Sequence, residues 1–217
     1  SKNPRPLLNH IDELKARGIG CYVQYSLNDY EEEKLERGVP PLAERIETFK
    51  KLVDVLGKGS VIWRFDPLVL TEDITIEKLL NKIENIGDQL KGYTEKLVFS
   101  FVDILSYNKV KNNLKANGIS FVDWTEDQMT EFASRLVALN IDKGWNYKLA
   151  TCGEKGRYPG VEPNHCIDDE LIIKKSFHDK ELMNYLKAEI KPIPPIDMFT
   201  NTITLPEGAI ILDSDHY

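Results

Sequence analysis

The stretch Ser60-Val61-Ile62-Trp63-Arg64-Phe65-Asp66-Pro67 decides how this sequence is read, because an apolar run ends there in an arginine and a carboxylate. The β-branched and aromatic residues at its start favour a buried strand. Pro67 has no N–H to donate to a sheet, so the strand is predicted to end near Asp66. Charges in such a place are costly unless they pair with each other or with a ligand. The stretch therefore predicts a core strand that leads into a candidate site.

The segments around this strand repeat the order helix, glycine, strand. A helix is predicted after Pro40 and Pro41, a second over residues 76–90, and strands begin near residues 21, 60 and 96. A fourth strand is predicted over 147–151, after a helix that starts at the capping-box sequence Thr125-Glu126-Asp127-Gln128. The charged run 31–37 is predicted to be a solvated loop. The repeated order of helix, glycine and strand is typical of an α/β fold with parallel strands.

The regular alternation of helices and strands ends after Glu154. Prolines and glycines over 156–163 predict a loop, and short helices are predicted over 170–174 and 180–188. The segments 202–205 and 209–212 flank Pro206-Glu207-Gly208 and predict a small C-terminal hairpin. We therefore expect a main domain over residues 1–190 and an extension over 191–217.

Composition and charge narrow the function classes. The 217 residues carry a net charge of -7, which disfavours a broad nucleic-acid surface while leaving room for a local basic groove. No apolar run approaches the roughly 18 residues that span a bilayer, and the N-terminus has no signal-peptide core. We expect a cytoplasmic protein without a membrane partner. Its three cysteines are too dispersed for a disulfide framework.

Polar residues gather where the predicted strands end. Because parallel strands share one carboxyl rim, and ligands bind at that rim, we expect these side chains to meet. Each of them alone is equally well explained as loop-facing polarity. The predicted ligand-binding residues are Gln24, Asn28, Arg64 and Ser100, and the predicted catalytic residues are Asp66, Asp103 and Glu154.

Arg64 is the predicted anchor for an anionic group, since a guanidinium offers a fork of donors to a carboxylate or phosphate. The alternative is an ion pair with Asp66 or Asp103 that only ties strands together. Asp66, Asp103 and Glu154 have the chemistry of general bases or of ligands for a hard metal. Their spacing matches no established motif.

Cys152 and Cys166 are the candidate metal ligands, with His165 beside the second. Structural zinc sites usually show two close cysteine pairs, and this sequence has none. The alternative is a pair of half-buried thiols in a loop region. The sequence also lacks GxGxxG, Walker and GxSxG motifs, so the best-marked nucleotide and hydrolase classes find no support.

Several separated motifs carry a family resemblance. They are Lys2-Asn3-Pro4, Tyr25-Ser26-Leu27-Asn28, Trp63-Arg64-Phe65-Asp66-Pro67, Ser100-Phe101-Val102-Asp103, Cys152-Gly153-Glu154 and Cys166-Ile167-Asp168. Together they resemble the bacterial family known as domain of unknown function 1848, over about residues 1 to 170.

The resemblance implies a partial (β/α) TIM-like barrel, similar to radical-SAM enzymes. S-adenosylmethionine and an iron-sulfur cluster are implied as cofactors by this resemblance alone. The given sequence departs from the family pattern, because within it no cysteine follows Cys166 and it does not contain the Arg-Thr-Asp motif of the family's N-terminal strand. Without three closely spaced cysteines, a site-differentiated four-iron cluster cannot be built from this sequence.

Two hypotheses follow for the function. The first is an enzyme-like barrel that binds a small polar or anionic molecule at the strand ends. The alternative is a non-catalytic binding or regulatory module on the same fold. Nucleic-acid binding ranks last because of the acidic charge.

Overall fold

The computed structural model describes residues 1–36, 38–102, 118, 120–152, 157–164, 168–176 and 180–185. The chain divides into two compact units. One comprises Ser1–Pro6 and Val23–Asn164, and the other comprises Leu7–Tyr22 and His165–Tyr217. The predicted hairpin over 202–212 and the predicted domain boundary at residue 190 lie outside the described residues.

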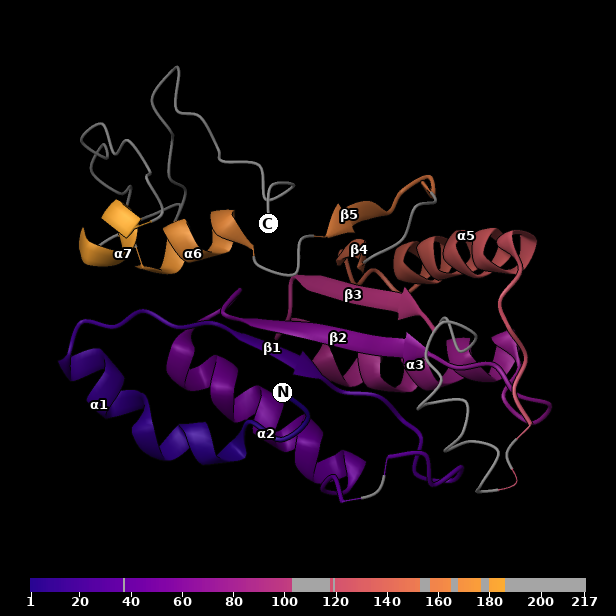
Figure 1. Cartoon of the computed structure of the whole chain (residues 1–217), viewed down its shortest axis with the longest axis horizontal. Coiled ribbons are helices and arrows are strands. Elements are labelled where there is room, and N and C mark those ends of the chain that lie inside the picture. The colour runs from indigo at the N-terminus through magenta and orange to yellow at the C-terminus, as the bar shows by residue number, and fades with distance from the viewer. Residues whose placement is uncertain are drawn as a thin grey trace. The chain divides into compact units, whose positions relative to one another are not determined.

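The first unit is built on one parallel sheet (Figure 1). Its five strands are hydrogen-bonded in the order β1-β2-β3-β4-β5, and every neighbouring pair is parallel. This parallel sheet alternates with helices along the chain, which confirms the predicted α/β fold. The sheet does not close, as expected for a partial barrel. The strands are β1 (Val23–Ser26), β2 (Val61–Leu68), β3 (Lys96–Phe101), β4 (Lys148–Cys152) and β5 (Glu162–Asn164).

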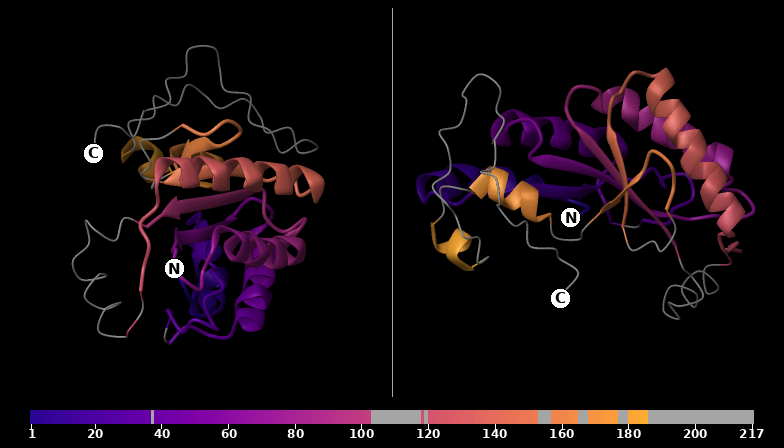
Figure 2. Two further views of the ribbon diagram at one scale, coloured as in Figure 1. Left: turned by 90° about the vertical axis from the view of Figure 1, so that its right-hand side faces the viewer. Right: turned by 90° about the horizontal axis from the view of Figure 1, so that it is seen from above.

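Three helices of this unit cover one face of the sheet (Figure 2). They are α2 (Leu42–Leu56), α3 (Ile76–Leu90) and α5 (Glu126–Asp142). Tyr25 of β1 stacks on Phe49 of α2, and Phe99 of β3 meets Phe132 of α5 edge to face. The strand register joins Tyr25 to Trp63 and Trp63 to Leu97, so these side chains belong to the same, helix-covered face.

The opposite face of the sheet carries the polar side chains. Side chains alternate along a strand, so residues one position away from the aromatic core point to this second face. Ser26 pairs in register with Arg64, Arg64 with Val98, and Cys152 with Asn164. We call this face the inner face, because in a barrel it is the side that faces the axis.

Strand β2 does not stop at the predicted place. It continues through Pro67 to Leu68, and its register with β3 shifts between Phe65 and Leu68. The strand therefore ends two residues beyond the predicted end near Asp66. The irregularity supplies the reason, since a residue at a bulge does not need the ladder N–H that proline lacks.

Helix starts follow the sequence signals closely. Thr125 and Gln128 form the predicted capping box at α5, with Thr125 accepting from the Gln128 N–H at 3.2 Å and Gln128 accepting from the Thr125 N–H at 3.0 Å. Thr75 caps α3 with the first of these two bonds, by accepting from the Lys78 N–H.

Strand β5 was not predicted from the sequence, because it has only three residues and contains Pro163. An edge strand tolerates that proline.

The second unit contains short helices. Near the N-terminus they are the 3-10 helix η1 (Arg5–His10), of which this unit includes Leu7–His10, and α1 (Ile11–Ala16). The later helices are α6 (Asp169–Ser176) and α7 (Lys180–Tyr185). Gly20 lies against α6 so closely that a Cβ there would be 2.5 Å from the Lys175 carbonyl oxygen. In the described part of the chain, no helix combines the length and apolarity needed to span a membrane.

Candidate functional site

The candidate site centres on Arg64, on the inner face of β2. Its Nε donates to Oδ2 of Asp66 at 2.7 Å, and its Nη2 lies 2.6 Å from the same oxygen. The two residues are two positions apart on one strand, which places them on the same face. Their side chains are only 13% and 16% exposed. The ion pair with Asp66 that the sequence left open is therefore formed, in a largely buried setting.

Side chains from two other strands reach the same guanidinium. Gln24 of β1 accepts a hydrogen bond from Nη1 of Arg64 through its Oε1. Cys152 of β4 lies close enough to interact electrostatically with the same guanidinium. In the sheet order, β3 lies between β2 and β4, so the arginine spans the strand beside its own. The inner face thus brings together Gln24, Arg64, Asp66 and Cys152.

The electrostatics of the site favour a charged guanidinium. Burial alone would lower the pKa of Arg64, but the hydrogen bonds and charge of Asp66, with the contact to Cys152, outweigh it and raise that pKa. The Asp66 carboxylate has a second oxygen, Oδ1, that makes no hydrogen bond to any described residue. The site consequently pairs a fixed cation with a carboxylate that has acceptor capacity left.

Asn28 holds the backbone of Asp66. Its Nδ2 donates to the Asp66 carbonyl at 2.9 Å, and its Oδ1 accepts from the Asp66 N–H at 2.9 Å. The side chain is fully buried, at the end of β1. Its amide is therefore turned to the backbone of the neighbouring strand. The predicted role of Asn28 in ligand binding stays a prediction.

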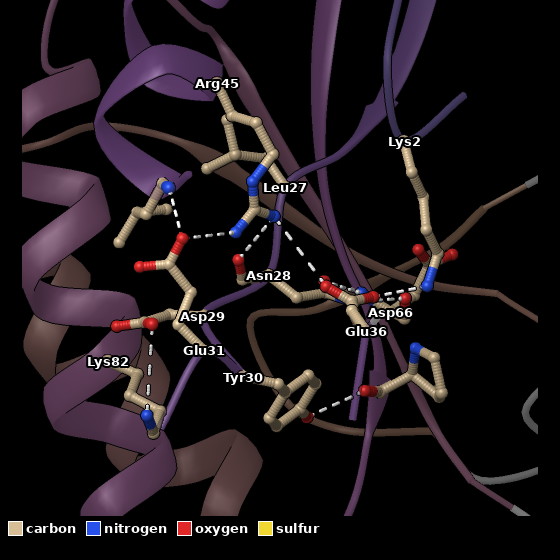
Figure 3. A network of polar contacts seen from close by, with 12 residues as sticks. Lys2, Leu27, Asn28, Asp29, Tyr30, Glu31, Glu36, Arg45, Asp66 and Lys82 are labelled. Atoms are coloured by element: carbon tan, nitrogen blue, oxygen red, sulfur yellow. Dashed lines mark hydrogen bonds and ion pairs between the residues drawn. The ribbon is translucent and has the colours of Figure 1, made fainter. Parts of the chain in front are cut away.

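A second polar network adjoins the site through Asn28 (Figure 3). Glu36 accepts from Asn28 Nδ2 at 2.9 Å and from Lys2, and its Oε2 lies 3.7 Å from Nη1 of Arg45. Arg45 of α2 is 1% exposed and donates from Nη1 to the Asn28 carbonyl at 2.9 Å. Buried charges of this kind require such partners.

Two glutamates of the charged run 31–37 are less solvated than its composition predicts. The side chains of Glu33 and Glu36 are 10% and 8% exposed. Glu33 pairs with Lys78 at 2.8 Å and with Lys82 at 3.3 Å, both on α3. The prediction of a solvated loop was wrong for these two carboxylates, because basic residues on the following helices reach them.

Sequence reasoning missed the Glu36 and Arg45 network. The signal that points to it is the helical position of Arg45, which falls on the apolar face of α2 beside Ile46, Phe49 and Leu52, all buried. An arginine on a core-facing stripe needs an acidic partner nearby, and the charged run 31–37 is the obvious source. Which glutamate it meets depends on the loop path, and sequence does not give that path.

The remaining predicted residues divide into two groups. Ser100 lies on the inner face of β3 and is half-buried. Asp103, Glu154 and Cys166 lie outside the described residues. The predicted roles of all four stay predictions.

The described residues offer no cluster for a metal. Among them, no three histidine, cysteine or acidic side chains come together in a way that could hold an ion. An iron-sulfur cluster needs several thiolates, and the cysteines of this chain are Cys21, Cys152 and Cys166. Burial raises the pKa of Cys21, with Lys15 opposing it, so that thiol is held away from its thiolate form. The cysteines of this chain do not fit such a cluster.

Comparison with known proteins gives one match. The family model for domain of unknown function (DUF1848) matches residues 1–191. No curated protein and no solved structure matches the chain.

Proposed function

Because this chain belongs to the family of domain of unknown function 1848, we propose its function from the site itself: it binds a small polar ligand with an anionic group on the inner face of the sheet. Arg64 is the residue proposed to hold the anionic group, and Gln24 and Asp66 flank it. The single observation that carries the proposal is the convergence of Gln24, Asp66 and Cys152 on one arginine from three strands.

The chemistry of Arg64 supports this role. A guanidinium carries five N–H donors in a planar fork, and it binds carboxylate or phosphate oxygens in pairs. Its pair with Asp66 is made to one carboxylate oxygen, Oδ2, through Nε and Nη2. The Oδ1 oxygen of Asp66 then has the capacity to accept from a cationic part of the same ligand. A zwitterionic ligand would match both charges.

S-adenosylmethionine is the ligand that the resemblance to radical-SAM enzymes implies. The carboxylate and ammonium of its methionine part are complementary to Arg64 and Asp66. An iron-sulfur cluster is not part of the proposal, because the cysteines of this chain do not fit one. The proposal is therefore one of binding, and it derives no radical step.

The alternative candidate is a non-catalytic binding or regulatory module. The same site would then bind the ligand without turning it over. The two readings differ in a single observation, namely whether the bound ligand is recovered unchanged. Incubation with S-adenosylmethionine followed by chromatography of the small molecules separates them.

A thermal-shift experiment tests binding. The protein is titrated separately with S-adenosylmethionine, inorganic phosphate and acetate, in the native sequence, in Arg64→Ala and in Arg135→Ala. Arg135 is the matched control, because it is an ion-paired arginine of α5 that is 39% exposed and lies outside the site. We expect at least one probe to raise the Tm of the native protein and of Arg135→Ala. The proposal fails if no probe does so, or if Arg64→Ala responds equally. A rise in Tm with phosphate alone would support the anion-binding site and would exclude S-adenosylmethionine as its ligand.

A further inference from the structure

Every polar atom of the Asn28 side chain is engaged. The amide oxygen accepts from the Asp66 N–H, and the amide nitrogen donates to both the Asp66 carbonyl and Glu36, each at 2.9 Å. An amide clamped on both backbone groups of one residue fixes the place of that residue. Asp66 is the residue so fixed, and its carboxylate is the partner of Arg64.

Glu36 connects this clamp to three parts of the chain. One carboxylate meets Lys2 of the N-terminal segment, Asn28 after β1 and Arg45 of α2 (Figure 3). At 8% exposed, it has little access to water as a substitute partner. Removing it would leave Asn28 with one acceptor fewer and Arg45 without its nearest buried counter-charge.

We propose that Asn28 and Glu36 are positioning residues that hold the Asp66 carboxylate on Arg64. The loop over residues 29–36 thereby controls how much of the guanidinium is available to an anionic ligand. The effect on ligand binding rests on the proposed function. The positioning of Asp66 by Asn28 and Glu36 can be tested without any ligand. Neither residue touches the guanidinium itself in the contacts described.

Cys152 provides the ligand-free readout, because it shares Arg64 with Asp66. A guanidinium released from Asp66 is freer to stabilise the thiolate of Cys152, and the thiolate is the form that iodoacetamide alkylates. Loosening of Asp66 should thus speed alkylation of Cys152. A general loosening of the fold should instead change the other cysteines as well.

The experiment measures the alkylation rate of each cysteine against pH in the full chain, by mass spectrometry of its peptides. We expect Asn28→Ala and Glu36→Ala to accelerate alkylation of Cys152 by about threefold or more. Asp66→Asn, which breaks the pair directly, should show at least the same acceleration. Cys21 should react at the native rate in every variant.

Glu33→Ala is the matched control for Glu36→Ala. Both glutamates lie in the same loop, both are ion-paired, and their side chains are 10% and 8% exposed. Only Glu36 contacts Asn28. We expect Glu33→Ala to leave the Cys152 rate unchanged. If Asn28→Ala does not fold, the comparison of Glu36→Ala with Glu33→Ala decides alone.

The inference is overturned if Asn28→Ala and Glu36→Ala both react at the native rate, whatever Asp66→Asn does. It is also overturned if Glu33→Ala accelerates Cys152 as much as Glu36→Ala, or if Cys21 accelerates in parallel. A failure of the proposed function looks different. In that case no anionic probe binds, while the alkylation rates change as expected and the positioning role stands.

Discussion

The guanidinium of Arg64 contacts a single oxygen of Asp66, through Nε at 2.7 Å and Nη2 at 2.6 Å. Both side chains come from β2, so the pair does not itself join two strands. The joining contacts are those from Arg64 to Gln24 of β1 and to Cys152 of β4. A pair formed within one strand is arranged to set the orientation of the arginine more than to hold the sheet together.

The first prediction concerns the strength of this pair. A double-mutant cycle of Arg64→Ala and Asp66→Ala should give a coupling energy of about 1 to 3 kcal/mol, because the pair is more buried than a surface ion pair and less buried than a core one. Urea denaturation of the four proteins measures it. The exposed pair of Arg5 and Glu44, at 57% and 48% exposed, is the control and should couple by less than about 0.5 kcal/mol. Equal coupling energies for the Arg64–Asp66 and Arg5–Glu44 pairs would contradict the conclusion that the first pair is largely buried.

The second prediction concerns the contact between α3 and Trp145. A Cβ at Gly87 would lie 2.5 Å from Cζ2 of Trp145, whose Nε1 donates to Asp88 at 2.9 Å. Gly87→Ala should therefore destabilise the protein by about 1 to 3 kcal/mol, although alanine is the better helix former. In a Trp145→Leu background the same change should become neutral or stabilising. A stabilising effect in the native background, measured by thermal unfolding, would disprove the close packing.

The third prediction concerns the start of α5. Thr125→Ala removes the acceptor for the Gln128 N–H and should cost about 1 kcal/mol. Thr130→Ala is the matched control, because it makes the same chemical change at an exposed position inside the helix. Helix propensity predicts a gain of a few tenths of a kcal/mol there. Loss of stability in both variants alike would speak against the cap.

The fourth prediction is a pH dependence at Asp29. Burial raises the pKa of this carboxyl, while Lys82, 4.0 Å away, opposes the rise and the nearby glutamates add to it. A carboxyl whose pKa is higher in the folded state binds protons more readily there, so stability falls as pH rises through that range. Asp29→Asn should thus raise Tm at pH 7, and the gain should vanish below about pH 4.

Asp54→Asn is the control for this pH profile, because it removes an exposed carboxylate from α2. It should change Tm little at either pH. A lower Tm for Asp29→Asn at pH 7 would show that the pair with Lys82 outweighs burial.

The fold could be predicted because its signals are local. The apolar periodicity of α2 and α3, the glycines after them and the β-branched strands specify an alternating order, and that order favours a parallel sheet. The strand-end rule also led to Gln24, Arg64 and Asp66, which the structure brings together. These residues share one face because side chains alternate along each strand.

The rest depends on long-range geometry that no local pattern encodes. The continuation of β2 past Pro67 depends on a register shift against β3. The burial of Glu36 depends on the path by which its loop returns to Arg45 and Asn28. Both features depend on contacts between segments that are far apart in the sequence. In the sequence itself, a run of charged residues looks the same whether its side chains are solvated or ion-paired.

The central claim is that Arg64 holds an anionic ligand group on the inner face. Isothermal titration calorimetry of the intact protein with S-adenosylmethionine and, separately, with inorganic phosphate tests it most directly. The account predicts saturable one-site binding of at least one of them to the native protein, about a hundredfold weaker in Arg64→Ala and unchanged in Arg135→Ala. Equal affinity in Arg64→Ala, or no saturable binding by the native protein, would contradict it.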